Sequence, residues 1–206
     1  MNISGTIFRK NKNSAGYTLV EILVALGLFM IVVSMAITAL SMATNANKVA
    51  QANRRITDSL DFTMEEIVRN VRKGETYNCG SATDLTAQIA AKNDGIGSPR
   101  NCAEGTYLSF EESTGDISLP GDQIIYRLDI DLDHVEKSTD GGNSWFRLTE
   151  PEVSVTNLKF YVTGASPNDG VQAKIRIILQ ALTKANPLTT TVFNVQTTVT
   201  QRSTDL

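Results

Sequence analysis

The sequence predicts an α+β protein in which a long N-terminal α-helix packs on an antiparallel β-sheet head. Two patterns predict the helix: a run without charged residues extends from Ile22 to Asn47, and a one-sided apolar stripe then continues to Val71. A third pattern predicts the sheet, because apolar and polar residues alternate along several segments after Thr106, as in strands with one buried face. We expect one continuous helix over Tyr17–Lys73 and strands in the later part of the chain.

The first part of this helix, residues 17–42, is apolar enough to span a membrane. Within Ile22–Met42, the residues that are not plainly apolar are Gly27, Ser34, Thr38 and Ser41. About 20 apolar residues in a helix cross the hydrocarbon core of a bilayer. We therefore expect a transmembrane helix that contacts membrane lipid and makes the chain a single-pass membrane protein.

The second part of the helix, residues 43–74, is amphipathic. Its apolar stripe advances in steps of four and three residues, so the side chains share one helix face. The stripe consists of Val49, Asn53, Ile56, Leu60, Met64, Ile67 and Val71. Gly74 is expected to end the helix, with Arg72 and Lys73 near the negative end of the helix dipole. We expect the stripe to pack on the head.

The composition of the whole chain excludes several classes of protein. The chain is 41% hydrophobic and 20% charged, unlike a collagen, a disordered chain or a polytopic membrane protein. Its formal net charge is −3, whereas nucleic-acid binding needs a basic surface. We expect no nucleic-acid partner.

The sequence contains no recognisable catalytic, cofactor or metal motif. His134 is the single histidine, and GxSxG, Walker and GxGxxG sequences are absent. The aspartates at Asp129–Asp133 do not begin an EF-hand loop. In a loop that starts at Asp129, the sixth and twelfth positions would be His134 and Asp140, whereas an EF-hand needs Gly and Glu there. The alternation of these aspartates with Ile130 and Leu132 predicts a solvated strand face. We expect no enzyme activity, no cofactor and no metal.

The N-terminal segment, residues 1–16, is short and polar. It contains the basic residues Arg9, Lys10 and Lys12 and no acidic residue, which favours a cytoplasmic N-terminus by the positive-inside rule. A secretory signal has its small-residue cleavage site after the apolar run, but Ser14-Ala15-Gly16 precedes the run here. Cleavage at this point would keep the membrane helix in the mature chain.

Glu21 is the acidic residue at the edge of the apolar run, and it allows two interpretations. In the first, the carboxylate lies at the membrane interface, where the helix dipole favours it. In the second, it pairs with a cation inside the membrane, since an unpaired carboxylate there costs free energy. The nearest candidate cation is the amine that cleavage before Tyr17 would create, supplied by another subunit.

These residues resemble a known leader. Gly16-Tyr17-Thr18-Leu19-Val20-Glu21, followed by Ile22–Leu26, is similar to the class III leader of type IV pilins and pseudopilins. The resemblance implies that a membrane-embedded aspartyl prepilin peptidase cleaves between Gly16 and Tyr17 and N-methylates Tyr17. It makes Glu21 the fifth mature residue, placed for pairing during assembly.

The resemblance also implies a location and partners. The single-pass protein would reside in the bacterial inner (cytoplasmic) membrane and then enter a pilus or pseudopilus with its head outside the cytoplasm. Its partners would be the prepilin peptidase, other pilin or pseudopilin subunits and an inner-membrane assembly platform.

Residues 75–104 are rich in Asn, Gly, Ala, Ser and Thr, which predicts a loop subdomain with a short helical turn at Leu85–Lys92. Asp94–Gly97 belongs to this loop. Cys79 and Cys102 lie near its ends. In an exported head they meet an oxidising compartment, which favours a disulfide over two buried thiols.

Residues 105–206 are expected to form the antiparallel β-sheet head, with about five to seven strands. The alternating or apolar segments are Gln123–Asp133, Val153–Val162, Val171–Ala181 and Phe193–Val199. Asp140-Gly141-Gly142-Asn143 predicts a hairpin turn between strands at Val135–Lys137 and Trp145–Leu148. Pro167–Gly170 and Asn186-Pro187 predict two further turns. Trp145 and Phe146 could form an exposed binding tip, but we expect the Trp to pack on the sheet.

Two later segments, Pro151–Tyr161 and Val195–Arg202, resemble W-type minor pilins and the related J-type minor pseudopilins of type II secretion. We therefore expect a structural, minor subunit of a type IV pilus or a type II secretion pseudopilus. The alternative is a membrane-anchored or pilus-tip binding module, an adhesin or DNA-uptake component, that uses the loops at 75–104 or 140–147.

Overall fold

The computed structural model describes residues 16–91, 98–113, 115–116, 119, 121–166, 170–183 and 191–202. The leader residues Arg9, Lys10 and Lys12, the loop at Asp94–Gly97 and the predicted turns at 167–169 and Asn186-Pro187 lie outside the described residues. The chain divides into two compact units, residues 1–47 and 48–206.

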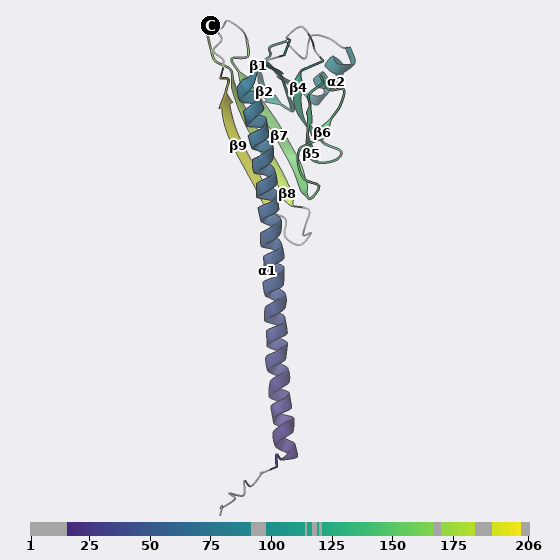
Figure 1. The fold of residues 1–206 in the computed structure, drawn as a ribbon, viewed down its shortest axis with the longest axis vertical. Coiled ribbons are helices and arrows are strands. Elements are labelled where there is room, and N and C mark those ends of the chain that lie inside the picture. The colour runs from purple at the N-terminus through teal and green to yellow at the C-terminus, as the bar shows by residue number, and fades with distance from the viewer. Residues whose placement is uncertain are drawn as a thin grey trace, which may run out of the picture. The chain divides into compact units, whose positions relative to one another are not determined.

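The helix α1 spans Leu19–Lys73 (Figure 1), which confirms the predicted long N-terminal helix. In the first unit its large apolar side chains are exposed, for example Leu28 and Phe29 at 61% each. This helix is long and apolar enough to cross a membrane.

In the second unit, the remainder of α1 buries one face in the head. The buried residues are Ile56, Ser59, Leu60, Thr63, Met64, Ile67 and Val71, so the predicted stripe is confirmed from Ile56 onward. The helix ends before Gly74, as expected. A side chain at Gly74 would overlap the ring of Phe110, so close packing requires this glycine.

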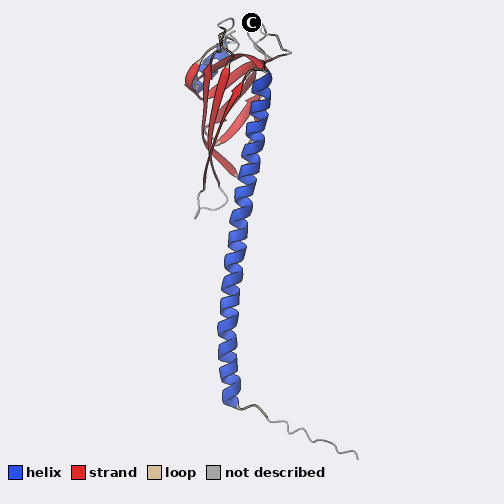
Figure 2. Ribbon diagram, turned by 90° about the vertical axis from the view of Figure 1, so that its left-hand side faces the viewer, coloured by secondary structure: helices blue, strands red, loops and turns tan. Residues whose placement is uncertain are grey.

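The head contains two antiparallel sheets, shown as red arrows in Figure 2. The first has the order β1-β3-β4-β5-β6, with the bounds β1 Gly74–Gly80, β3 Tyr107–Glu112, β4 Ile124–Asp129, β5 His134–Ser138 and β6 Phe146–Arg147. The second has the order β2-β7-β8-β9, with the bounds β2 Cys102–Gly105, β7 Val153–Thr163, β8 Lys174–Thr183 and β9 Val192–Thr200. We predicted a single sheet, but the head contains two. The difference arises because alternation shows which face of a strand is buried but not which strands pair.

One main core joins α1 to both sheets. Leu60 and Ile67 of the helix share it with Phe110 and Tyr126 of the first sheet and Phe160 of the second. A smaller cluster lies under helix α2, Ala82–Ala91, and contains Leu85, Tyr107 and Ile125 with Ile89 and Trp145 against it. The first sheet is therefore covered on both faces.

The predicted loop at residues 75–104 is the largest local difference from the sequence analysis. It contains β1, α2 and β2, where only a short helical turn was expected. Both strands pair with strands from later in the chain, β1 with β3 and β2 with β7. Tertiary pairing therefore overrides the weak strand preference of Asn, Gly and Ser in this segment.

The predicted solvated strand face at Asp129–Asp133 is also wrong. Strand β4 ends at Asp129, whose Oδ1 accepts the backbone N–H groups of Asp131 at 2.9 Å and Leu132 at 3.1 Å. Asp133 has a φ of 52°. These residues form the β4–β5 hairpin turn, because an aspartate side chain that bonds its own backbone competes with strand pairing.

The β5–β6 hairpin is confirmed. Glu136 pairs with Arg147 and Lys137 with Phe146. The turn is held by Asp140, whose Oδ1 accepts the N–H of Ser144 at 2.8 Å. This bond, the hydroxyl of Ser138 and the other bonds of the turn lower the pKa of Asp140 to about 2.

Candidate functional site

The candidate processing site lies at the start of α1. Gly16 and Tyr17 precede the helix, and the Tyr17 side chain is 78% exposed. Thr18 is the cap: its Oγ1 accepts the N–H of Glu21 at 3.3 Å, and its carbonyl accepts the N–H of Ile22 at 3.3 Å. The spacing of Thr18 and Glu21 is that of a capping box. This signal was not predicted, although a Thr followed three residues later by a Glu can be read directly from the sequence.

Glu21 is exposed in the first turn of α1. The dipole of a helix favours a carboxylate at this end, as the first interpretation requires. A shallow groove along the helix is lined by Tyr17, Glu21, Ile22, Ala25, Leu26 and Phe29. Tyr17 and Glu21 therefore border one surface, which is otherwise apolar.

The few polar side chains of the apolar run bond to the helix itself. Ser34 donates to the carbonyl of Met30 at 2.7 Å, Thr38 to Ser34 at 2.9 Å and Ser41 to Ile37 at 2.9 Å. In lipid an unsatisfied polar group costs several kcal/mol. Because these hydroxyl groups already donate hydrogen bonds within the helix, they add no unsatisfied donor. The segment can therefore be surrounded by an apolar environment on all sides.

The two cysteines form the expected disulfide. Cys79 of β1 is bonded to Cys102 of β2, with the Cα atoms 5.6 Å apart. Because β1 and β2 belong to different sheets, the bond joins the two sheets. A side chain at Gly105 would overlap the sulfur of Cys79, so the disulfide requires a glycine beside it.

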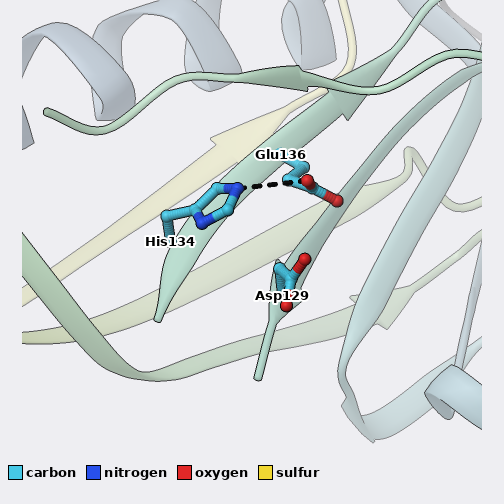
Figure 3. Close-up of side chains that lie close together, drawn as sticks. All are labelled: Asp129, His134 and Glu136. Carbon is cyan, nitrogen blue, oxygen red and sulfur yellow. Dashed lines mark hydrogen bonds and ion pairs between the residues drawn. The ribbon is translucent and has the colours of Figure 1, made fainter. Parts of the chain in front are cut away.

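Asp129, His134 and Glu136 lie close together on β4 and β5 (Figure 3). Their ligand atoms have protein partners: His134 Nε2–H donates to Glu136 Oε1 at 3.1 Å. Glu136 Oε2 accepts Arg127 Nε at 3.0 Å and Nη2 at 2.9 Å. Because Arg127 supplies the positive charge that a metal ion would bring, the cluster is satisfied as a polar network that holds the hairpin.

Trp145 packs on the sheet, as expected, rather than forming a binding tip. The guanidinium of Arg127 lies 3.6 Å from the centre of its ring. Phe146 beside it is 57% exposed. Of the two aromatic residues, Phe146 is therefore exposed and Trp145 is partly buried.

Comparison with known proteins identifies the N-terminal segment. Residues 11–37 match the family described as "Prokaryotic N-terminal methylation motif". No curated protein and no solved structure matches the chain. The chain therefore carries the prokaryotic N-terminal methylation motif, which is the type IV pilin leader, at the start of a long apolar helix. A long N-terminal helix followed by two antiparallel sheets is an α+β fold of pilin-like architecture.

Proposed function

We propose that this pilin-like protein is a structural, minor subunit of a type IV pilus or a type II secretion pseudopilus. The prepilin peptidase cleaves it between Gly16 and Tyr17 and methylates Tyr17. It then assembles with other subunits at an inner-membrane platform and places its head outside the cytoplasm. The observation that carries this proposal is the methylation motif at residues 11–37 on a helix whose apolar side chains are exposed.

The exposed half of α1 explains how the protein assembles. Its apolar side chains need a partner that the chain itself does not supply, since a helix that is apolar all round is stable only when it is covered. Lipid covers it before assembly, and the helices of other subunits cover it in the filament. Moving between these two apolar environments leaves no hydroxyl unsatisfied, because Ser34, Thr38 and Ser41 bond to their own helix.

Glu21 sets the register of the assembled helices in this proposal. Its carboxylate pairs with the amine of Tyr17 in an adjacent subunit, and the two residues border the same apolar groove. A subunit placed out of register would leave a carboxylate unpaired in an apolar core, which is strongly unfavourable. Because the amine exists only after cleavage, assembly waits for processing.

The processing step is tested by mass spectrometry of the mature chain. In cells that contain the prepilin peptidase, we expect a chain that begins at methylated Tyr17. Cells without the peptidase are the control and should keep the leader. An intact N-terminus in both strains would contradict the proposal.

The pairing step is tested by Glu21→Ala. We expect this variant to be cleaved normally but to enter filaments poorly, measured as the fraction of the protein in sheared or purified filaments. Glu65→Ala is the matched control, because Glu65 is an exposed glutamate on the head part of the same helix. Equal incorporation of Glu21→Ala and the wild type would show that pairing does not set the register.

A second candidate function is a binding module on the head, favoured by one surface. The outer face of the second sheet has a groove lined by Cys102, Ala103, Tyr161, Thr163, Lys174, Arg176 and Thr198. Arg176 lies 4.2 Å from the centre of the Tyr161 ring. Two exposed basic side chains beside an aromatic ring suit an acidic glycan. Binding of the full chain in detergent to an acidic glycan, lost in Arg176→Ala and retained in Lys48→Ala, tests this function.

A further inference from the structure

A groove lies between α1 and the segment that joins β6 to β7, within the second unit of the chain. Its volume is about 220 Å³, below the range of about 300–1,000 Å³ for pockets that enclose a drug-sized ligand. Ile56 and Val153, each 1% exposed, are buried residues of its lining. The volume suits a small chemical group rather than a large ligand.

The charged residues of the groove form two pairs of opposite sign. Lys48 and Arg55 line it from α1, about two turns apart and thus on one helix face. Glu150 and Glu152 line it from the β6–β7 connection. All four side chains are exposed, and in the described part of the chain no ion pair joins any of them to another residue. The groove can therefore bind a ligand that carries both signs of charge.

Hydrogen bonds hold the acidic side of the groove in place. The hydroxyl of Ser59 on α1, a residue 6% exposed, accepts the backbone N–H of Glu150 at 3.2 Å. The carbonyl of Glu150 accepts Arg147 Nη2 at 3.0 Å and the N–H of Val153 at 3.1 Å. The backbone at Glu150 is thus tied to the same helix that carries the two basic residues, which lowers the cost of ordering the groove around a ligand.

The groove begins where the charge-free run of α1 ends. Lys48 directly follows Asn47, the last residue of the run that starts at Ile22. As part of a helix, this run is about 40 Å long at 1.5 Å per residue, and a bilayer with its headgroup regions is about 40–45 Å thick. A membrane that this run spans, as in the proposed function, therefore has its phospholipid headgroups at the level of Lys48.

We propose that the groove binds the zwitterionic headgroup of a membrane phospholipid. The phosphate binds to Lys48 and Arg55, and the ammonium binds to Glu150 and Glu152. The planar guanidinium of Arg55 offers several donors to phosphate oxygens, while the two carboxylates accept hydrogen bonds from the ammonium. The inference rests on the membrane anchoring in the proposed function and adds to it a lipid with a defined headgroup.

The lining residues also select the type of ammonium. A primary ammonium, as in phosphoethanolamine, donates hydrogen bonds that carboxylates accept. The quaternary ammonium of phosphocholine has no N–H and is recognised by aromatic rings, and no aromatic residue of the described chain lines the groove. The groove therefore favours phosphatidylethanolamine over phosphatidylcholine.

The test is native mass spectrometry of the full chain in detergent micelles with equal amounts of phosphatidylethanolamine, phosphatidylglycerol and phosphatidylcholine. We expect the chain to retain phosphatidylethanolamine about ten-fold over each of the others, because neither of them has an ammonium that donates to Glu150 and Glu152. Arg55→Gln should weaken the retention of all three lipids, which share the phosphate. Glu152→Gln should weaken only that of phosphatidylethanolamine.

The chain offers a matched control for each variant. Arg54 is an exposed arginine beside Arg55 that does not line the groove, and Glu65 is an exposed glutamate of α1 outside it. Arg54→Gln and Glu65→Gln should therefore retain lipids as the wild type does. Equal retention of the three lipids by the wild type, or equal losses in Arg54→Gln and Arg55→Gln, would overturn the site. Dimers without lipid preference, lost only in Arg55→Gln, would assign the groove to a second copy of the chain instead.

A failure of this inference can be told from a failure of the proposed function. Membrane anchoring is measured by whether the full chain stays with phosphatidylcholine vesicles after an alkaline wash. A chain that is washed off contradicts the anchoring, on which both the proposed function and the headgroup site rest. A chain that stays with the vesicles but shows no preference for phosphatidylethanolamine in micelles contradicts the headgroup site alone.

Discussion

The two halves of α1 share one backbone conformation, but their apolar side chains have opposite surroundings. In the first half, Leu28 and Phe29 are each 61% exposed, whereas Leu60 and Ile67 in the second half are 1% and 0% exposed. The first half is apolar on all sides and the second half on one face only. The difference shows that the head supplies a partner for a single stripe, so that the fully apolar half must find its partner outside the chain.

The polar side chains of the two halves also differ: those of the first half bond within the helix, whereas several of the second half bond to the head. Ser34 in the first half bonds to a carbonyl of its own helix. In the second half, Glu66 accepts Lys137 Nζ of β5 at 2.7 Å, and Asn70 donates to the hydroxyl of Tyr126 at 2.7 Å. The first half thus makes its polar contacts within the helix but leaves its apolar side chains exposed. The second half makes both polar and apolar contacts with the head.

A pair of leucine truncations tests this comparison with the largest expected effect. Leu60→Ala removes a side chain from the core, which should lower the free energy of unfolding of the head by about 3 kcal/mol. Leu28→Ala is the matched control and should leave it unchanged, since Leu28 is exposed. Urea unfolding of the full chain in detergent, followed by near-UV circular dichroism, measures both. Equal losses in the two variants would break the distinction between the halves.

Removing the disulfide tests how much the link between the two sheets, which pack on the second half of α1, stabilises the head. Replacing Cys79 and Cys102 by Ala should lower the free energy of unfolding by about 3 kcal/mol, because the bond closes a loop of the unfolded chain. Urea unfolding with and without a reductant gives the same comparison in the wild type. We expect the reductant to destabilise the wild type and to leave the double variant unchanged. A wild type that is insensitive to the reductant would contradict the structural role of the bond.

The Glu66–Lys137 pair tests the polar anchor of the second half. Burial alone would raise the pKa of Glu66, but the ammonium of Lys137 and the guanidinium of Arg69 lower it below the usual value of 4.5. A lowered pKa stabilises the fold above the unfolded-state pKa, and this stabilisation is lost as the pH falls through the folded-state pKa. Glu66→Gln should therefore cost about 2 kcal/mol at pH 7.

The same variant gives a pH signature. Below the usual glutamate pKa of 4.5, the wild type should lose stability toward that of Glu66→Gln, and the two unfolding curves should converge. Glu65→Gln is the control, because Glu65 is exposed on the same helix and should follow the wild type at every pH. A constant difference between wild type and Glu66→Gln down to pH 2 would show that the carboxylate charge is not what stabilises the contact.

Most of α1 could be predicted from the sequence, because each of its halves has a strong periodic signal. The run without charged residues from Ile22 to Asn47 predicts a helix that is apolar on all sides. The stripe from Ile56 to Val71 predicts a helix with one buried face, and Gly74 predicts where this helix ends. The β5–β6 hairpin was predictable for the same reason, since its glycine-rich turn determines the local backbone.

Strands β1 and β2 could not be predicted, because their order comes from long-range pairing and the Cys79–Cys102 bond rather than from local preference. The helical turn predicted at Leu85–Lys92 overlaps α2, which spans Ala82–Ala91. The contact between Gln123 and Glu111 was missed for a similar reason: the two residues are 12 positions apart and meet only when β3 pairs with β4. At the candidate processing site, the methylation motif was readable. The cap at Thr18 was readable as well, because Thr18 and Glu21 have the spacing of a capping box; only the favourable effect of the helix dipole on Glu21 was predicted.

The smallest expected effect concerns that cap. In the proposed mature chain, a positive amine on Tyr17 would lie two residues before the helix begins at Leu19, where the helix dipole disfavours a cation. The hydroxyl of Thr18 holds the N–H of Glu21, and both residues lie on the mature side of the proposed cleavage point, so cleavage leaves the cap intact.

Thr18→Ala should cost the first turn about 1 kcal/mol, which corresponds to about five-fold faster hydrogen exchange at the amide of Glu21. Ser34→Ala is the control: Ser34 bonds to its own helix at mid-span, so its loss should leave exchange at Glu21 unchanged. Faster exchange in Thr18→Ala but not in Ser34→Ala would show that the hydroxyl of Thr18 stabilises the first turn of α1. Unchanged exchange in Thr18→Ala would mean that the surrounding detergent or lipid, rather than the cap, orders the first turn of α1.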